Sequence, residues 1–108
     1  MNDTSLHTLA DLEDKQPYVL RLYVTGMTPR STRAISAVRA ICEEFLAGRF
    51  DLEIIDVYQQ PARIRDEQIL ATPTLVKVGP QPERRMIGDM SNRARVIAGL
   101  GLREPVTA

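Results

Sequence analysis

The chain has 108 residues and carries 14 basic and 14 acidic side chains, so its formal net charge is zero. This length suits one compact domain, and the charge balance lacks the positive surplus that nucleic-acid and anionic-membrane binding favour. The sequence contains no apolar run of the roughly 20 residues that cross a bilayer. A lone cysteine, Cys42, cannot form an internal disulfide and fits a reducing compartment. We therefore expect one cytoplasmic domain that binds neither nucleic acid nor membrane.

Charge is unevenly distributed along the chain. Residues 1–16 form an acidic segment, in which four carboxylates precede the first basic residue: Asp3, Asp11, Glu13 and Asp14. The segment lacks the basic start and apolar stretch of a secretory signal, and we expect a flexible tail. Beyond it the basic residues outnumber the acidic ones, and nearly all of them are arginines. The folded domain is expected over residues 17–102, with a short tail over 103–108.

The first half of the domain predicts a strand, a helix and a second strand. Residues 18–24 are apolar on both faces apart from Arg21, which is typical of a central strand. Thr28 suits an N-cap and the following proline a first helical position. Apolar residues then recur at three- and four-residue spacing until Gly48. A second strand is expected over 52–57, and this crossover implies that the two strands are parallel.

The second half predicts shorter elements. A short helix is expected over 61–70, and two strands over 72–78 and 85–87, with a proline-containing turn between them. Ser91 is predicted to cap a last helix. The element order is therefore βαβαββα, an α/β fold with the order of thioredoxin.

The chemistry of a thioredoxin-type enzyme needs two thiols in the loop after the first strand, at the start of the helix. Residues 27–30 read Met-Thr-Pro-Arg and contain no thiol. Cys42 lies on the apolar face of the helix and is expected to be an inert packing residue. His7 lies in the acidic segment, and a lone carboxylate at a strand end, Asp56, is typical of a cap or turn. We expect no catalysis, no cofactor and no metal site.

A set of ordered segments carries a specific resemblance. These are Thr-Gly-Met-Thr-Pro after the first strand, Ile-Asp-Val in the second, then Ile-Leu-Ala-Thr-Pro-Thr-Leu, Ile-Gly-Asp-Met-Ser-Asn-Arg and a final Gly-Leu at residues 99 and 100. In this order and at this spacing they resemble the KaiB family of clock proteins, over about residues 17–102. Pro73 stands where thioredoxin-like proteins carry a cis proline that helps to shape a binding surface.

The resemblance implies a non-enzymatic regulatory protein that docks on the N-terminal ATPase ring of a KaiC-like hexamer. Further clock regulators or a histidine kinase are implied as additional partners. It also implies a fold switch, between a resting tetramer or dimer with the order βαββααβ and a partner-binding state with the order βαβαββα. By position it assigns partner binding to four basic residues: Arg33, Lys77, Arg84 and Arg85. The fold balance is assigned to Gly99, with Gly101 and Pro73 as further fold-switch candidates.

Two alternatives stay open at this point. A single-cysteine redox protein would use Cys42. A sensor domain like that of the clock histidine kinases would keep the thioredoxin-like fold permanently and is expected to be a monomer. Gly101, where the KaiB family usually has aspartate, and Gln68, where it usually has lysine, indicate a divergent member.

Overall fold

The computed structural model describes residues 16–102, so the expected tail over 103–108 and all but the last residue of the expected tail over 1–16 lie outside the described residues. Seven elements follow one another: β1 (Tyr18–Val24), α2 (Pro29–Phe45), β2 (Phe50–Asp56), α3 (Pro61–Glu67), β3 (Thr74–Gly79), β4 (Arg84–Ile87) and α4 (Arg93–Gly99). This is the order βαβαββα, so the predicted thioredoxin-like α/β fold is confirmed. The second order, βαββααβ, stays a prediction.

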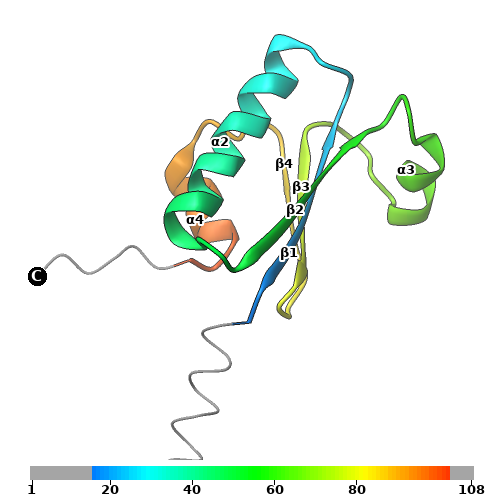
Figure 1. The fold of residues 1–108 in the computed structure, drawn as a ribbon. Helices are drawn as coiled ribbons and strands as arrows, with labels where there is room; N and C mark the ends of the chain where they lie inside the picture. Colours follow the sequence, from blue (N-terminus) through cyan, green and yellow to red (C-terminus); the bar gives the residue numbers. More distant parts are fainter. Residues whose placement is uncertain (1–15, 103–108) are drawn as a thin grey trace, which may run out of the picture.

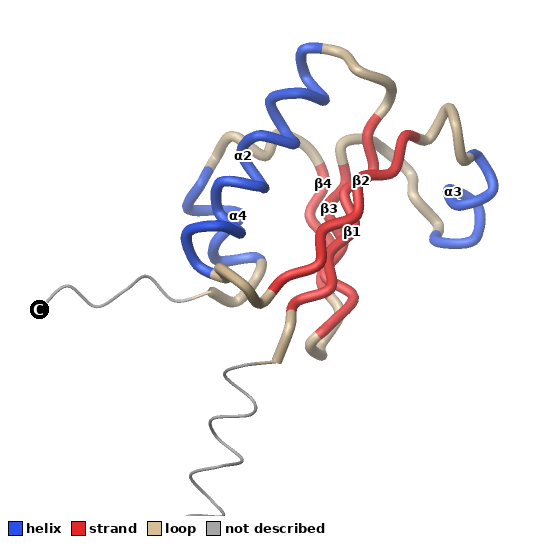
Figure 2. The backbone as a smooth tube through the Cα atoms, in the orientation of Figure 1, coloured by secondary structure: helices blue, strands red, loops and turns tan. Residues whose placement is uncertain are grey.

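The four strands form one sheet in the order β2-β1-β3-β4. β1 pairs with β2 in parallel, as predicted, and β3 runs antiparallel to both β1 and β4. Helices α2 and α4 lie on one face of the sheet and α3 on the other (Figures 1 and 2). β1 is therefore a central strand covered on both faces, which explains its nearly continuous apolar sequence.

Alternation along β1 divides the core into two parts. Leu20, Leu22 and Val24 are fully or almost fully buried against α2 and α4. Tyr23 points to the opposite face and is buried with Ile55 beneath α3. Burying an aliphatic side chain of this size contributes about 1.5 to 3 kcal/mol, so the larger core beneath α2 and α4 dominates the stability of the fold.

Helix α2 begins as the sequence predicts. The Thr28 hydroxyl accepts a hydrogen bond from the Ser31 main-chain N–H at 3.1 Å, and Pro29 occupies the first turn. The cap satisfies one of the N–H groups that have no partner within the helix. The helix ends at Phe45, three residues before the positive-φ turn at Gly48, so the predicted end is confirmed to within a turn.

Two details of the prediction are wrong. The N-cap of α4 is Asn92, whose carboxamide oxygen accepts from the Arg95 N–H at 3.1 Å. The Ser91 N–H is instead bonded to the Asp89 carboxylate, so Ser91 belongs to the preceding turn. Helix α3 ends at Glu67 and does not continue to residue 70, because Gln68 adopts a left-handed conformation (φ 57°) that closes the helix.

Candidate protein-docking surface

The position where thioredoxin-type chemistry would occur carries no thiol. The loop between β1 and α2 contains Gly26, Met27 and Thr28 but no thiol. Cys42 is fully buried in the core beneath α2, and burial raises the pKa of its thiol to about 11. A thiol of this kind is overwhelmingly protonated at neutral pH and is therefore a poor nucleophile. Within residues 16–102 no three His, Cys, Asp or Glu side chains are grouped to hold a metal ion.

Asp56 ties together the carboxyl ends of β1 and β2. Its Oδ1 atom accepts hydrogen bonds from the main-chain N–H groups of Gly26 at 3.1 Å and Tyr58 at 2.9 Å. This is the turn-forming role predicted for Asp56. The hydroxyls of Thr25 and Thr72 are hydrogen-bonded to each other, which brings the loop before β3 to the same place. Three loops from distant parts of the sequence therefore meet at one end of the sheet.

This end of the sheet exposes large apolar side chains. Met27 is 76% exposed, Tyr58 74% and Leu70 91%, each from a different one of the three loops. Beside them lies a cavity of about 310 Å³ with a mainly apolar lining that includes Val57, Ile64, Ile69 and Tyr58. Exposed apolar side chains grouped around a hollow are typical of protein–protein interaction sites.

A basic cleft lies on the α2 side of the same loop. It has a volume of about 220 Å³ and is lined by the first turns of α2, by Pro73 and by the turn before α4, including Arg30, Arg33 and Asp89. Hydrogen bonds from Ser91 lower the pKa of Asp89, and the positive charges of Arg30 and Arg33 lower it further. The cis Thr72–Pro73 peptide separates the two hollows, because Thr72 lines the apolar one and Pro73 the basic one. We call Met27, Tyr58, Leu70, Arg30 and Arg33 together the end surface.

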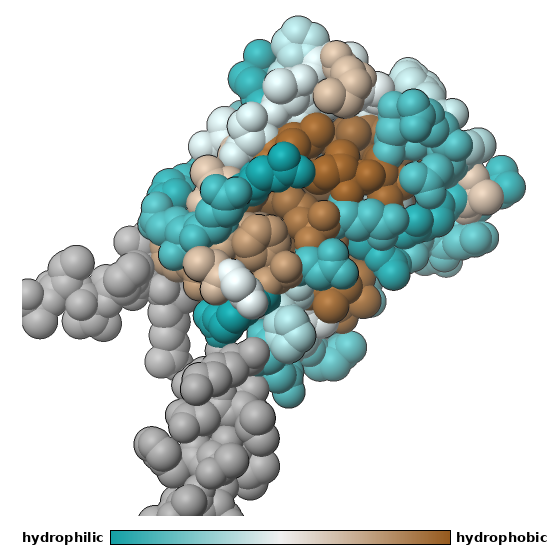
Figure 3. Space-filling model, viewed as in Figure 1, coloured by the Kyte–Doolittle hydropathy of each residue, from teal (hydrophilic) through white to brown (hydrophobic). Residues whose placement is uncertain are grey.

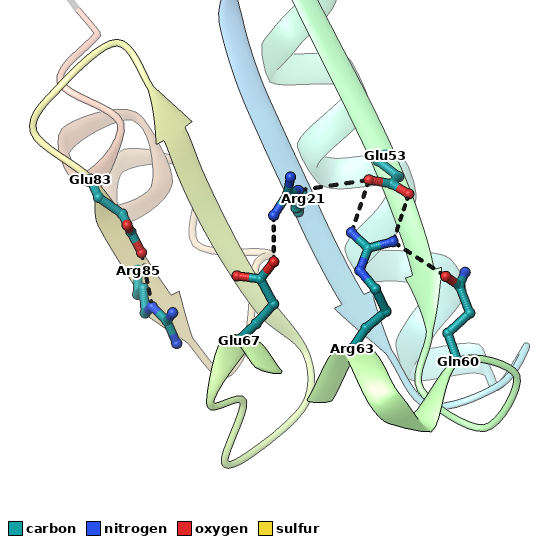
Figure 4. Close-up of polar contacts among 7 residues, drawn as sticks. All are labelled: Arg21, Glu53, Gln60, Arg63, Glu67, Glu83 and Arg85. Carbon is teal, nitrogen blue, oxygen red and sulfur yellow. Dashed lines mark hydrogen bonds and ion pairs between the residues drawn. The ribbon is translucent and has the colours of Figure 1, made fainter. Parts of the chain in front are cut away.

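The four basic residues singled out from the sequence do not form one patch. Arg33 lines the cleft of the end surface, whereas Lys77 and Arg84 face each other on β3 and β4 at the opposite end of the sheet. Arg85 points to the α3 face, where its guanidinium lies 3.3 Å from Glu83 (Figure 4). It also donates to the Gln68 carbonyl at 3.2 Å. A single flat contact could not engage all four.

The fold-switch candidates occupy close-packed or constrained backbone positions. Gly99 is the last residue of α4, and a Cβ there would lie 2.2 Å from the Met86 Sδ atom, so α4 approaches β4 closely at this point. Gly101 has a φ of +72°, which a residue with a side chain adopts only at a cost. Pro73 follows a cis peptide bond and lines the basic cleft. Their roles in a fold switch stay predictions.

A network of ion pairs, which the sequence does not predict, holds α3 against the sheet (Figure 4). Arg21 on β1 donates to Glu67 at the end of α3 at 2.5 Å and lies 3.7 Å from Glu53 on β2. Arg63 on α3 binds the same Glu53 through two hydrogen bonds of 3.1 and 3.2 Å. These bonds lower the pKa of Glu53. The network matters for the fold because α3 itself contributes no fully buried side chain.

The β2 edge of the sheet is also accessible. β2 pairs only with β1, and its Leu52 and Ile54 side chains are only partly buried. Figure 3 shows hydrophobic surface between α2 and α3, over this edge. An unpaired edge strand with apolar neighbours can accept a strand from another chain.

The sequence matches the model of the KaiB domain over residues 21–102. The chain belongs to the KaiB family. It is 48% identical over 89 residues to the circadian clock protein KaiB3 of Synechocystis, covering 82% of this chain and 87% of that protein. It is 49% identical over 88 residues to the circadian clock oscillator protein KaiB of Thermosynechococcus vestitus, with 82% of each chain covered. Such relatives support a clock regulatory role for this member of the family.

Solved structures place the fold among thioredoxin-like proteins. The N-terminal domain of Synechococcus elongatus SasA has a TM-score of 0.66 and 27% identity, covering 84% of this chain and 90% of that domain. Chloroplastic thioredoxin z has a TM-score of 0.64 at 19% identity, over 94% of this chain and 88% of its own, which shows a shared fold only. None of the helices within residues 16–102 is long and apolar enough to cross a membrane.

Sequence reasoning missed most of the end surface. From the sequence, Met27 is only a loop residue in a segment without a thiol, and Leu70 falls within the helix expected over 61–70. The available signal was that each exposed apolar side chain directly adjoins a turn or loop: Met27 follows Gly26, and Tyr58 follows the turn at Asp56. That signal does not show that the loops meet, which depends on the sheet order.

Proposed function

We propose that the chain is a non-enzymatic regulator that docks on the N-terminal ATPase ring of a KaiC-like hexamer through the end surface. The observation that carries this proposal is the exposure of Met27, in the loop where a thioredoxin would hold its reactive thiols, together with that of Tyr58 and Leu70 in the two adjoining loops. Membership in the KaiB family supports the class of partner. Cytoplasmic location follows from the same proposal.

The chemistry of the end surface defines the partner surface that would fit it. The apolar side chains call for an apolar pocket or helix face, and burying one leucine contributes about 1.5 to 3 kcal/mol. Arg30 and Arg33 call for carboxylates on the partner, because a guanidinium binds a carboxylate through two parallel hydrogen bonds. Asp89 in the same cleft disfavours a second acidic group deeper inside, which limits the orientation of the complex.

Substitutions on the end surface test this proposal. Leu70→Ala is expected to weaken binding to an ATP-loaded KaiC-type hexamer by about 10- to 100-fold, because Leu70 is 91% exposed and its burial would be lost. Arg33→Ala is expected to weaken it as well. Arg39→Ala is the matched control, since Arg39 is an exposed arginine of the same helix that does not line the cleft. Equal affinities for all four proteins, measured by biolayer interferometry, would refute the proposed surface.

The basic residues at the other end of the sheet form a second part of the proposal. Lys77, Arg84 and Arg85 would contact the partner only if it extends around the β3–β4 end, or if further clock regulators or a histidine kinase bind there. Arg85 is already paired with Glu83, so we expect Arg85→Ala to reduce binding less than Arg84→Ala. Competition binding with each variant distinguishes the two contacts.

The proposed mechanism includes a fold switch from a resting tetramer or dimer with the order βαββααβ. A rare binding-competent state lowers apparent affinity by its fractional population and slows the formation of the complex. The structure of the SasA N-terminal domain supports the alternative of a sensor module that keeps the thioredoxin-like fold. The molar mass of the free protein separates the two, since the switch requires an oligomer that converts to a bound monomer and the sensor module is a monomer throughout.

A further inference from the structure

Lys77 and Arg84 form an uncompensated pair of cations at the β3–β4 end of the sheet. They are directly opposite each other in the register of the two strands, and Lys77 is only 5% exposed. Within residues 16–102 neither side chain forms an ion pair, and Glu83, the carboxylate next to Arg84 in the sequence, is engaged by Arg85 at 3.3 Å. Burial and the neighbouring Arg84 lower the pKa of Lys77. The pair is therefore an electrostatic site that a carboxylate would stabilise.

The acidic segment enters the fold beside this pair. Tyr18 is the first residue of β1, and the Lys77 ammonium lies 5.6 Å from the centre of its ring. The Tyr18 hydroxyl donates to the Leu100 carbonyl at 3.4 Å, which fixes the ring beneath the cation. Asp14 precedes Tyr18 by four residues, which extended chain spans in at most about 14 Å. The carboxylates of Asp11, Glu13 and Asp14 are thus within reach of both cations.

We propose that the acidic stretch at residues 11–14 docks on the Lys77–Arg84 pair of the same chain and occupies it as an intramolecular ligand. Charge and position both favour the acidic stretch as the ligand of this pair. It carries three negative charges. It also precedes Tyr18, whose ring contacts the Lys77 ammonium. If this pair also contacts a partner, which rests on the proposed function, the stretch would compete with the partner's carboxylates. Neutralising it would then tighten partner binding.

A spin label distinguishes docking from simple proximity. Tyr18 pairs directly with Phe50 on β2, whereas Lys77 on β3 pairs with Leu20, so proximity to Tyr18 alone would not favour the Lys77 side. A nitroxide is attached at Thr8→Cys in the full chain; the buried thiol of the native cysteine resists labelling. Docking predicts several-fold stronger paramagnetic broadening of the Lys77 and Arg84 amides than of the Phe50 and Asp51 amides. The asymmetry should vanish in 1 M salt, where the screening length is about 3 Å.

Charge neutralisation supplies the matched comparison. The variant D11N/E13Q/D14N should make the broadening symmetrical and lower the NMR-measured pKa of Lys77 by about 0.3 to 0.7, the effect of a surface ion pair. The control E43Q/D66N neutralises two exposed carboxylates on α2 and α3, outside the ion pairs of the structure and outside both sets of reporter amides. It should leave both readouts unchanged. Symmetrical broadening in the native chain, or equal Lys77 pKa values in all three proteins, would overturn the proposal without bearing on ring binding.

Discussion

The contact between Arg21 and Glu67 gives the sharpest energetic prediction. It joins the central strand to the end of α3, with the two charged groups 2.5 Å apart and their side chains 29% and 26% exposed. Replacing Glu67 by Gln removes the charge and keeps the shape, and Arg21→Met removes the guanidinium. A double-mutant cycle then isolates the pairwise free energy from the other contacts of each residue.

The expected coupling follows from the partial burial of the pair. A hydrogen bond to a charged group contributes roughly 1.5 to 3 kcal/mol when buried, and an exposed ion pair about 0.2 to 1 kcal/mol. With about a quarter of each side chain exposed, we expect about 1 kcal/mol. Arg85 and Glu83 are the internal control, because they lie 3.3 Å apart but are 35% and 49% exposed. Their coupling should be below about 0.5 kcal/mol.

Urea unfolding at one fixed protein concentration measures both cycles, since oligomerisation would otherwise alter apparent stability. Hydrogen exchange of α3 amides should accelerate more than that of α2 amides in Glu67→Gln, because Glu67 holds α3 and not α2. A coupling for Arg21 and Glu67 no larger than that of the control pair would refute the assignment of this network as the fastening of α3.

Three further predictions concern other parts of the fold. Arg63 lowers the pKa of Glu53, so the ionised carboxylate stabilises the fold above its unfolded pKa near 4.5. That stabilisation should be lost as the pH falls through the lower pKa that Glu53 has in the folded protein. In thermal unfolding measured over a series of acidic pH values, Glu53→Gln should therefore reduce the dependence of stability on pH. Cys42, buried and with a pKa raised to about 11, should resist iodoacetamide at pH 8 in the native protein and react rapidly in urea, as mass spectrometry would show; rapid native labelling would contradict its burial. Thr28→Ala should destabilise the protein by about 1 kcal/mol through the lost cap on the Ser31 N–H, while Thr28→Ser should retain most of the stability; equal losses in chemical denaturation would mean that the cap contributes nothing.

Local signals were sufficient for the order and type of the elements. Each strand and helix carries its own periodicity and its own breaker, such as Thr28 with the following proline at the start of α2. Boundaries that depend on competing side chains were less predictable. Ser91 and Asn92 can both cap a helix, and the outcome depends on Asp89, which binds the Ser91 N–H and leaves Asn92 to cap.

The candidate site was less accessible to sequence reasoning, because it is assembled from loops. Whether Leu70 is buried or exposed depends on the left-handed turn at Gln68, which ends α3 and points Ile69, not Leu70, into the core. Likewise, Lys77 and Arg84 become neighbours only through the β3–β4 register, while Arg85 falls on the other face by strand alternation. The resemblance to the KaiB family singles out Lys77, Arg84 and Arg85 but does not predict where they lie relative to one another.

Complex formation by the native chain is the most direct test of docking on the ring. Size-exclusion chromatography with light scattering would compare the protein alone with the protein after hours of incubation with an ATP-loaded KaiC-type hexamer. We expect the chain to move into the peak of the hexamer and its own oligomer peak to decline at the same slow rate. A chain that stays out of the ring fraction in every nucleotide and phosphorylation state of the hexamer would contradict it.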